Sequence, residues 1–157
     1  MTAAHPATES ARRFLDAVLW GKHLEVWAML STAARSTGIA LAERKGLDAV
    51  VAARARAGTW TEAEADELLT DLVRGLRTDL AAVELAEIIV GEPPLDGDLS
   101  ADDQPAGTRV KVPMSVPSLL PPELTGGEGW AAGTIDMVRT PAGWFVDRLD
   151  ARRVRHQ

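Results

Sequence analysis

The order of secondary structure along the chain constrains its fold most strongly. Apolar residues recur at helical spacing through the first half of the sequence, whereas the runs 130–139 and 144–150 alternate apolar and polar residues as strands do. The segment Thr140-Pro-Ala-Gly143 between these runs suits a tight turn, with proline at its second position and glycine at its end. Helices followed by an antiparallel hairpin indicate an α+β fold, in which the helices pack on a sheet.

The length and charge of the chain fit one acidic domain. The chain has 157 residues and a net charge of −6, and it lacks the concentrated basic surface of a nucleic-acid partner. We predict a single domain over 8–150, between a loose tail at 1–7 and a basic tail at 151–157. The polar start lacks an apolar signal segment, and no run approaches the ~18 apolar residues of a membrane span. We therefore expect a cytoplasmic protein with no membrane partner.

Three residue types that many enzymes use are missing. The sequence has no cysteine, tyrosine or asparagine, which excludes disulfides, thiol nucleophiles, tyrosine acids and asparagine donors. His5, His23 and His156 form no pair at metal-ligand spacing with a carboxylate, and no glycine-rich phosphate loop precedes a helix. We therefore expect neither a metal nor another cofactor.

Capping residues and breakers place the remaining elements. Thr61 and Glu64 form a capping box at the start of a long helix with a continuous apolar face. An earlier helix is expected to start at Thr8 or Ser10. Pro113 cannot donate to a sheet ladder, so an edge or a bulge is expected there. Further helices are predicted at 24–38 and 39–57, the latter broken at Gly46, and further strands at 83–90 and 108–116.

The turn at 140–143 predicts a register for the final hairpin. With a bulge at Gly143, one ion pair and two apolar pairs fall opposite each other, whereas a slip by one residue would set Asp136 against Asp147. The predicted pairs are Thr140 with Trp144, Val138 with Val146, Asp136 with Arg148, and Ile135 with Leu149. The preferred interpretation of Asp136 is thus an ion pair with Arg148, and a catalytic or ligand-orienting role is the alternative.

This pattern resembles the nuclear transport factor 2-like (NTF2-like) family over residues 11–150. The resemblance rests on the opening helix pair at 11–30, on the further helices before the sheet, and on the closing strand Gly143-Trp-Phe-Val-Asp-Arg-Leu149. It implies a cone-shaped α+β fold, in which N-terminal helices pack on a strongly curved antiparallel sheet. It also implies a pocket inside the cone and a homodimer formed through the outer face of the sheet.

The resemblance limits the chemistry. Ketosteroid isomerase-like, limonene epoxide hydrolase-like and scytalone dehydratase-like members depend on tyrosine, which is missing here. A polyketide cyclase-like mechanism with a single carboxylate fits, with Asp136 or Asp147 as the base. Arg148 is the third candidate catalytic residue. Candidate ligand-binding residues are Phe14, Trp27, Met137, Phe145, Leu119 and Leu120.

The two faces of the hairpin are expected to differ in role. We expect Trp144, with Val138 and Val146, at the centre of the dimer contact, and core packing or ligand contact is the alternative for Trp144. The other face carries Ile135, Met137, Phe145, Asp147 and Leu149, and it is expected to pack on the helices or line the cone.

Three functions therefore stand open. The first is a non-catalytic NTF2-like domain that binds an apolar small molecule or assists a partner. The second is a cofactor-free enzyme of the cyclase or isomerase type that uses one pocket carboxylate. The third is a protein-interaction domain whose cone is filled by its own side chains.

Overall fold

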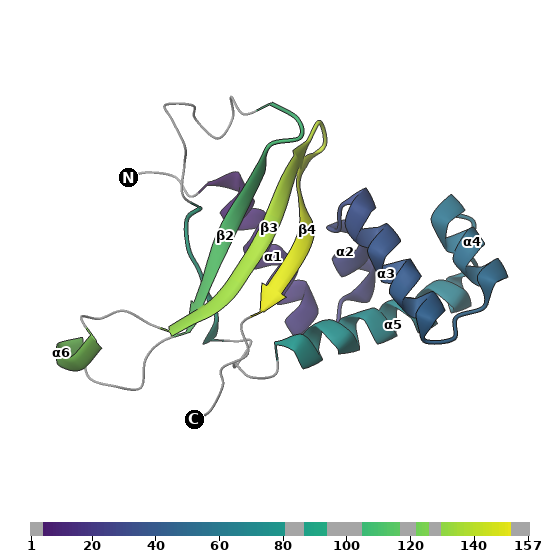
Figure 1. Ribbon diagram of the computed structural model, residues 1–157, viewed down its shortest axis with the longest axis horizontal. Helices are drawn as coiled ribbons and strands as arrows, with labels where there is room; N and C mark the ends of the chain where they lie inside the picture. The colour runs from purple at the N-terminus through teal and green to yellow at the C-terminus, as the bar shows by residue number, and fades with distance from the viewer. Residues whose placement is uncertain (1–4, 81–86, 94–104, 117–121, 126–129, 152–157) are drawn as a thin grey trace.

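The protein is an α+β structure in which five N-terminal helices pack against a strongly curled antiparallel sheet (Figure 1). The computed structural model describes residues 5–80, 87–93, 105–116, 122–125 and 130–151. The helices are α1 (Pro6–Leu19), α2 (His23–Ala28), α3 (Thr32–Arg44), α4 (Ala49–Ala57), α5 (Glu62–Asp79) and the short α6 (Pro122–Thr125). The strands are β1 (Ile89–Val90), β2 (Arg109–Val116), β3 (Trp130–Thr140) and β4 (Gly143–Ala151), and they are ordered β1-β2-β3-β4. The predicted fold class is confirmed.

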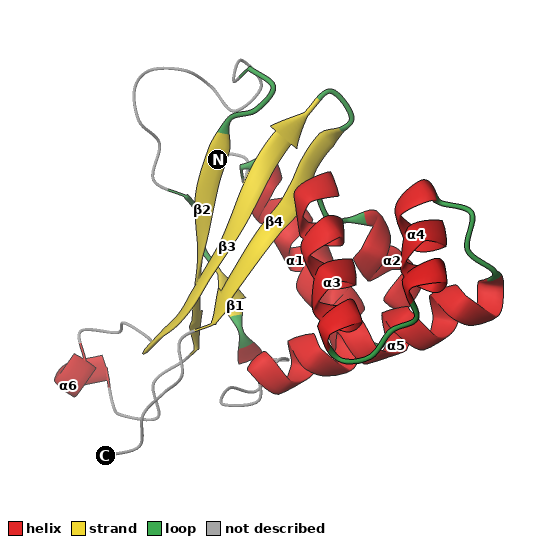
Figure 2. Ribbon diagram, turned by 45° about the vertical axis from the view of Figure 1, so that its right-hand side comes forward, coloured by secondary structure: helices red, strands yellow, loops and turns green. Residues whose placement is uncertain are grey.

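The helices occupy two positions relative to the sheet. Helix α1 crosses one face of the sheet, whereas α2 to α5 gather beyond the β4 edge (Figure 2). The main core lies between α1 and the sheet, where Phe14 and Val18 pack with Val112, Ile135 and Met137, all fully buried. The helix face that the apolar spacing of α1 predicts is thus the face that covers the sheet.

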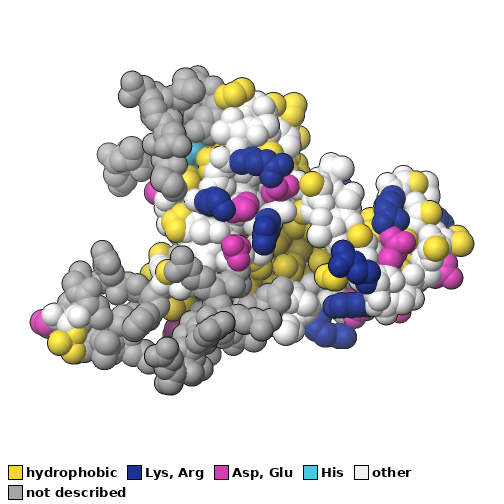
Figure 3. Space-filling model, in the orientation of Figure 1, with side chains coloured by type: hydrophobic (Ala, Val, Ile, Leu, Met, Phe, Trp, Pro, Cys, Tyr) yellow, Lys and Arg dark blue, Asp and Glu magenta, His cyan; other side chains and the backbone are white. Residues whose placement is uncertain are grey.

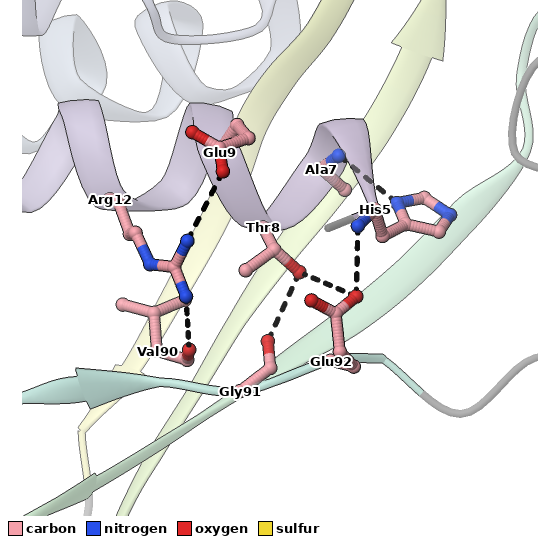
Figure 4. Close-up of polar contacts among 8 residues, drawn as sticks. All are labelled: His5, Ala7, Thr8, Glu9, Arg12, Val90, Gly91 and Glu92. Atoms are coloured by element: carbon pink, nitrogen blue, oxygen red, sulfur yellow. Dashed lines mark hydrogen bonds and ion pairs between the residues drawn. The ribbon is translucent and has the colours of Figure 1, made fainter. Parts of the chain in front are cut away.

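The first residues of the domain differ from the expected tail. Helix α1 begins at Pro6, and His5 caps it, because its Nδ1 accepts from the Ala7 N–H at 3.0 Å. The His5 N–H in turn donates to Glu92 Oε2 at 2.9 Å (Figure 4). The His5 ring also lies edge-on to Trp144. Residues 5–7 therefore belong to the domain, and 1–4 lie outside the described residues.

Helix α1 also binds the backbone of the outer strand β1 and the residue after it. Thr8 Oγ1 lies 3.1 Å from the Gly91 carbonyl oxygen, and Arg12 Nη2 donates to the Val90 carbonyl oxygen at 3.4 Å (Figure 4). Thr8 is fully buried, so its hydroxyl needs this partner. These contacts satisfy carbonyls that a sheet edge would otherwise leave unpaired.

The register of the final hairpin corrects the prediction near the turn. Thr140 pairs with Gly143, Val138 with Phe145, and Met137 with Val146, so the predicted Thr140–Trp144 and Val138–Val146 pairs are wrong. The register then shifts between Met137 and Asp136, and beyond the shift Asp136 pairs with Arg148 and Ile135 with Leu149, as predicted. The bulge therefore lies at Asp147 and not at Gly143, and it still keeps Asp136 from facing Asp147.

This register changes which residues face the helices. Trp144 is 7 % exposed and Val146 is 1 % exposed, and both belong to the main core. They cannot form the centre of an outer dimer contact, so that expectation is wrong. Phe145 is paired with Val138 on the opposite, outer face, whereas Ile135, Met137 and Leu149 pack in the core as expected.

The segment between α2 and α3 covers the edge of β4. The predicted helix 24–38 is two helices, because the chain leaves α2 at Met29 and forms a parallel bridge between Leu30 and Val146. The Val146 N–H donates to the Met29 carbonyl at 2.8 Å, and the Ser31 N–H donates to the Val146 carbonyl at 2.8 Å. Ser31 then caps α3, which continues unbroken to Arg44. A strand edge and a helix start are thus joined at one point.

The capping box of α5 is present as predicted, since the Glu64 N–H donates to Thr61 Oγ1 and the Thr61 N–H donates to Glu64 Oε1.

Pro113 lies on β2, where its carbonyl accepts from the Gly91 N–H, just beyond the end of β1. Its missing N–H therefore faces a position where the neighbouring strand has ended. Within the described residues, no helix is long and apolar enough to cross a membrane.

Candidate functional site

An apolar groove lies between β4 and the helices α3 and α5. Its volume is about 630 Å³, within the range of small-molecule sites. Figure 3 looks into the hollow between the sheet and the helices, where apolar side chains form the bottom and charged side chains stand on both sides. The apolar lining comprises Phe14, Leu30, Ala34, Leu41, Ala42, Leu47, Val51, Leu68, Leu72, Leu76, Val146 and Leu149.

Anchored helix ends hold the groove open. Helix α3 starts against β4 at Ser31, and its 13 residues carry it about 20 Å away from the sheet. Trp27 of α2 packs on Trp60 beside the α5 capping box, with ring centroids 5.3 Å apart. Helix α3 is anchored to β4 at Ser31, and Leu41, farther along the helix, is 45 % exposed.

Asp147 lies at the sheet end of the groove, and each of its carboxylate oxygens has a protein partner. Its Oδ1 accepts from Ser31 Oγ at 2.7 Å, and its Oδ2 pairs with Arg109 Nη1. The Asp147 side chain is 12 % exposed, so these two partners replace most of its hydration. The bulge positions this carboxylate, because it inserts Asp147 between two paired positions of β4.

Arg148 follows Asp147 in the groove lining and has no such partner. It stands opposite Asp136 in the sheet, but Asp136 Oδ1 is paired with Lys111 Nζ at 3.6 Å. Among the residues that the structure describes, no carboxylate forms an ion pair with Arg148. The expected Asp136–Arg148 ion pair is thus replaced by the Lys111 contact, and the exposed Arg148 guanidinium is left for solvent or a ligand.

The opposite end of the groove carries charges of both signs. Arg54 binds Glu64 through two nitrogens, at 3.1 and 2.5 Å. The Arg54 guanidinium, with the Thr61 backbone N–H, lowers the pKa of Glu64 from 4.5 to about 2. Lys45, Asp48, Glu67 and Asp71 also line the groove from the helices, so acidic side chains outnumber basic ones on this side.

The groove brings together part of the predicted site. Phe14, Asp147 and Arg148 line it. Met137 lies buried under α1, Trp27 packs on Trp60, and Phe145 lies on the outer sheet face. None of these three, nor Asp136, is among the described residues that line the groove. Leu119 and Leu120 lie outside the described residues.

Sequence reasoning missed the contribution of α3 and α5 to the groove. Leu41, Leu72 and Leu76 read as ordinary core positions of two helices, and nothing in their spacing says that the helices diverge from the sheet. One signal was present, because Gly38 and Gly75 interrupt helices that otherwise have good helix formers. Interior glycines of this kind often have a packing or functional reason.

A second, shallower pocket of about 470 Å³ lies on α5 near the start of α2. His23 opens α2, and its Nε2 lies 2.8 Å from Asp66 Oδ1 of α5. Arg77 Nη2 donates to the Leu19 carbonyl at 3.3 Å. These contacts connect the helices to one another, so we assign this pocket a structural role. No group of three or more histidine, aspartate or glutamate side chains in the described residues could hold a metal ion.

Comparisons of the chain with protein-family models, with curated proteins and with solved structures found no match. The groove is therefore the basis of the functional proposal.

Proposed function

We propose that the protein is a non-catalytic domain of NTF2-like architecture that binds an apolar small molecule in the groove. The observation that carries the proposal is the groove itself, with about 630 Å³ of space and a leucine-rich lining open to solvent. Apolar surface of this kind is stabilised when a ligand covers it. The helices on a curled sheet are compatible with NTF2-like proteins, which makes that family our proposal for its origin.

The arrangement of the carboxylates favours binding over catalysis. A general base needs an oxygen within reach of the substrate proton. Both oxygens of Asp147 already accept from protein donors, and Asp136 lies away from the groove lining. Each Asp147 oxygen keeps a second lone pair, but a substrate proton could reach it only beside Ser31 or Arg109.

The experiment compares two exposed leucines. Leu41 lines the groove, whereas Leu24 on α2 is 64 % exposed and is not among the residues lining it. We expect native mass spectrometry of the protein from its own host to show a bound mass that denaturation removes. Leu41→Glu should abolish this mass, because a charge would stand in the apolar channel, and Leu24→Glu should retain it.

Loss of the bound mass in both variants, or in neither, would contradict the groove as the site. A protein that carries no small molecule in any preparation and instead co-purifies with a protein in a Leu41-dependent manner would favour the interaction-domain alternative.

A further inference from the structure

The charges at the two ends of the groove differ in how they are compensated, and this difference bears on the ligand. At the sheet end, Asp147 is neutralised by Arg109 and hydrogen-bonded by Ser31, and Asp136, which does not line the groove, is paired with Lys111. Asp147 and Arg148 are the two charged residues of β4 among those that line the groove, and Arg148 is the one without an ion-pair partner in the described part of the chain. At the other end, Lys45 and Glu67 carry opposite charges, and Asp48 Oδ1 accepts from the Val50 N–H at 2.7 Å.

From this distribution, and resting on the proposed function, we infer that the ligand is an amphipathic carboxylate. Its carboxylate binds Arg148, and its aliphatic tail runs along α3 and α5. A guanidinium presents a planar pair of donors that matches a carboxylate, which makes arginine the fitting partner for such a head group. Val146 and Leu149 of the same strand also line the groove and begin the apolar path of the tail.

Two glycines support the path of the tail. Gly38 and Gly75 lie inside α3 and α5, line the groove and have no positive φ. A Cβ at Gly75 would meet nothing within 4 Å, and a Cβ at Gly38 would meet only Leu72 Cδ1, at an ordinary 3.8 Å. Neither backbone conformation nor internal packing therefore demands glycine, although glycine weakens a helix relative to alanine. An aliphatic chain that lies against the backbone of α3 and α5 accounts for the glycine at both positions.

The test uses isothermal titration calorimetry of the full chain with three probes of equal chain length, namely octanoate, octan-1-ol and octylammonium, at pH 7.5 and low salt. We expect octanoate to bind about tenfold or more tightly than octan-1-ol, the gain of a charge-assisted hydrogen bond. Octylammonium should bind more weakly than the alcohol, because its charge would face Arg148.

Arg148→Gln should lower the octanoate affinity to that of octan-1-ol and leave the alcohol affinity unchanged, which also shows that the groove is intact. Arg44→Gln is the matched control, because Arg44 is exposed on α3 and is not among the described residues that line the groove. An octanoate preference that survives Arg148→Gln, or tightest binding of octylammonium, would overturn the inference.

Two results would separate this inference from the proposed function. If all three probes bind equally and Leu41→Glu weakens all of them, the groove binds apolar molecules but the anionic head is wrong. If none of the probes binds while a native ligand is retained, the inferred carboxylate ligand is wrong, and the proposal that the groove binds a small molecule remains.

A stability measurement tests the path of the tail. Gly75→Ala should raise the melting temperature of the ligand-free protein by about 2–4 °C. It should also weaken octanoate and octan-1-ol alike, because the methyl group occupies the channel. Unchanged affinity for both probes would show that the tail does not pass Gly75.

Discussion

One hydroxyl, that of Ser31, supports both the start of α3 and the bulge of β4. Ser31 Oγ accepts from the Ala34 N–H at 3.0 Å and donates to Asp147 Oδ1 at 2.7 Å. Ser31 is 7 % exposed, so solvent cannot replace either partner easily. The helix cap and the sheet end of the groove therefore depend on the same side chain.

Ser31→Ala should remove both interactions. A lost cap costs about 1 kcal/mol, and a lost hydrogen bond to a charged group costs about 1.5–3 kcal/mol, so we expect a loss of about 2–4 kcal/mol in the free energy of unfolding. For a domain of this size, that corresponds to a melting temperature lower by about 5–15 °C. Urea unfolding followed by circular dichroism measures the first quantity, and calorimetry measures the second.

Ser31→Asp separates the two roles of the hydroxyl. Aspartate caps a helix as well as serine does, so an isolated cap would tolerate it. Here it would remove the donor and set a second carboxylate against Asp147, so we expect this variant to be less stable than Ser31→Ala. Ser31→Thr should remain close to the wild type, because it keeps both the donor and the acceptor.

A companion change tests the origin of the loss. Adding Asp147→Asn to Ser31→Asp should recover stability, because an amide N–H can donate to the new carboxylate. The reasoning is refuted if Ser31→Asp unfolds at the same urea concentration as the wild type, or if Asp147→Asn gives no recovery.

Two further contacts, Arg54 with Glu64 and Thr8 with the Gly91 carbonyl, can be tested by substitution. Glu64→Gln should lower stability at neutral pH, because Arg54 holds the folded-state pKa of Glu64 at about 2, below its ordinary 4.5. The deficit should be full above pH 4.5 and vanish as the pH falls towards 2, and a deficit that is constant with pH in urea titrations would contradict the pairing. Thr8→Val should cost about 1–3 kcal/mol, because the partly buried Gly91 carbonyl loses its hydroxyl donor. An unchanged unfolding free energy would show that the contact does not stabilise α1 on the sheet edge.

The local signals of the sequence were sufficient for several elements of the fold. Thr61 and Glu64 define the start of α5 through a chemical rule that depends on only four residues. The alternation in 130–139 and 144–150 is equally local, so the hairpin and its α+β context followed from it. The register near Gly143 was predicted wrongly, because the extra residue of β4 could lie either at the turn or at a bulge farther along the strand. The burial of Trp144 and Val146 in the main core determines that it lies at Asp147.

The candidate site was less accessible to prediction, because it depends on how elements diverge in space. Asp136 and Asp147 were identified as acids on apolar strands, yet their partners lie far away in sequence: Lys111 for Asp136, and Ser31 and Arg109 for Asp147. The separation between α3 and β4 is a tertiary property. No periodicity in either element encodes it.

The side chains that a bound probe touches would show directly whether the groove is the ligand site. Leucine and valine methyl groups are labelled with carbon-13, and nuclear Overhauser effects from octanoate are recorded. We predict contacts to Leu41, Leu72 and Leu76, which line the groove, and none to Val112, which is buried between α1 and the sheet. Contacts to Val138 on the outer sheet face, without any to the groove leucines, would contradict the assignment of the groove as the ligand site.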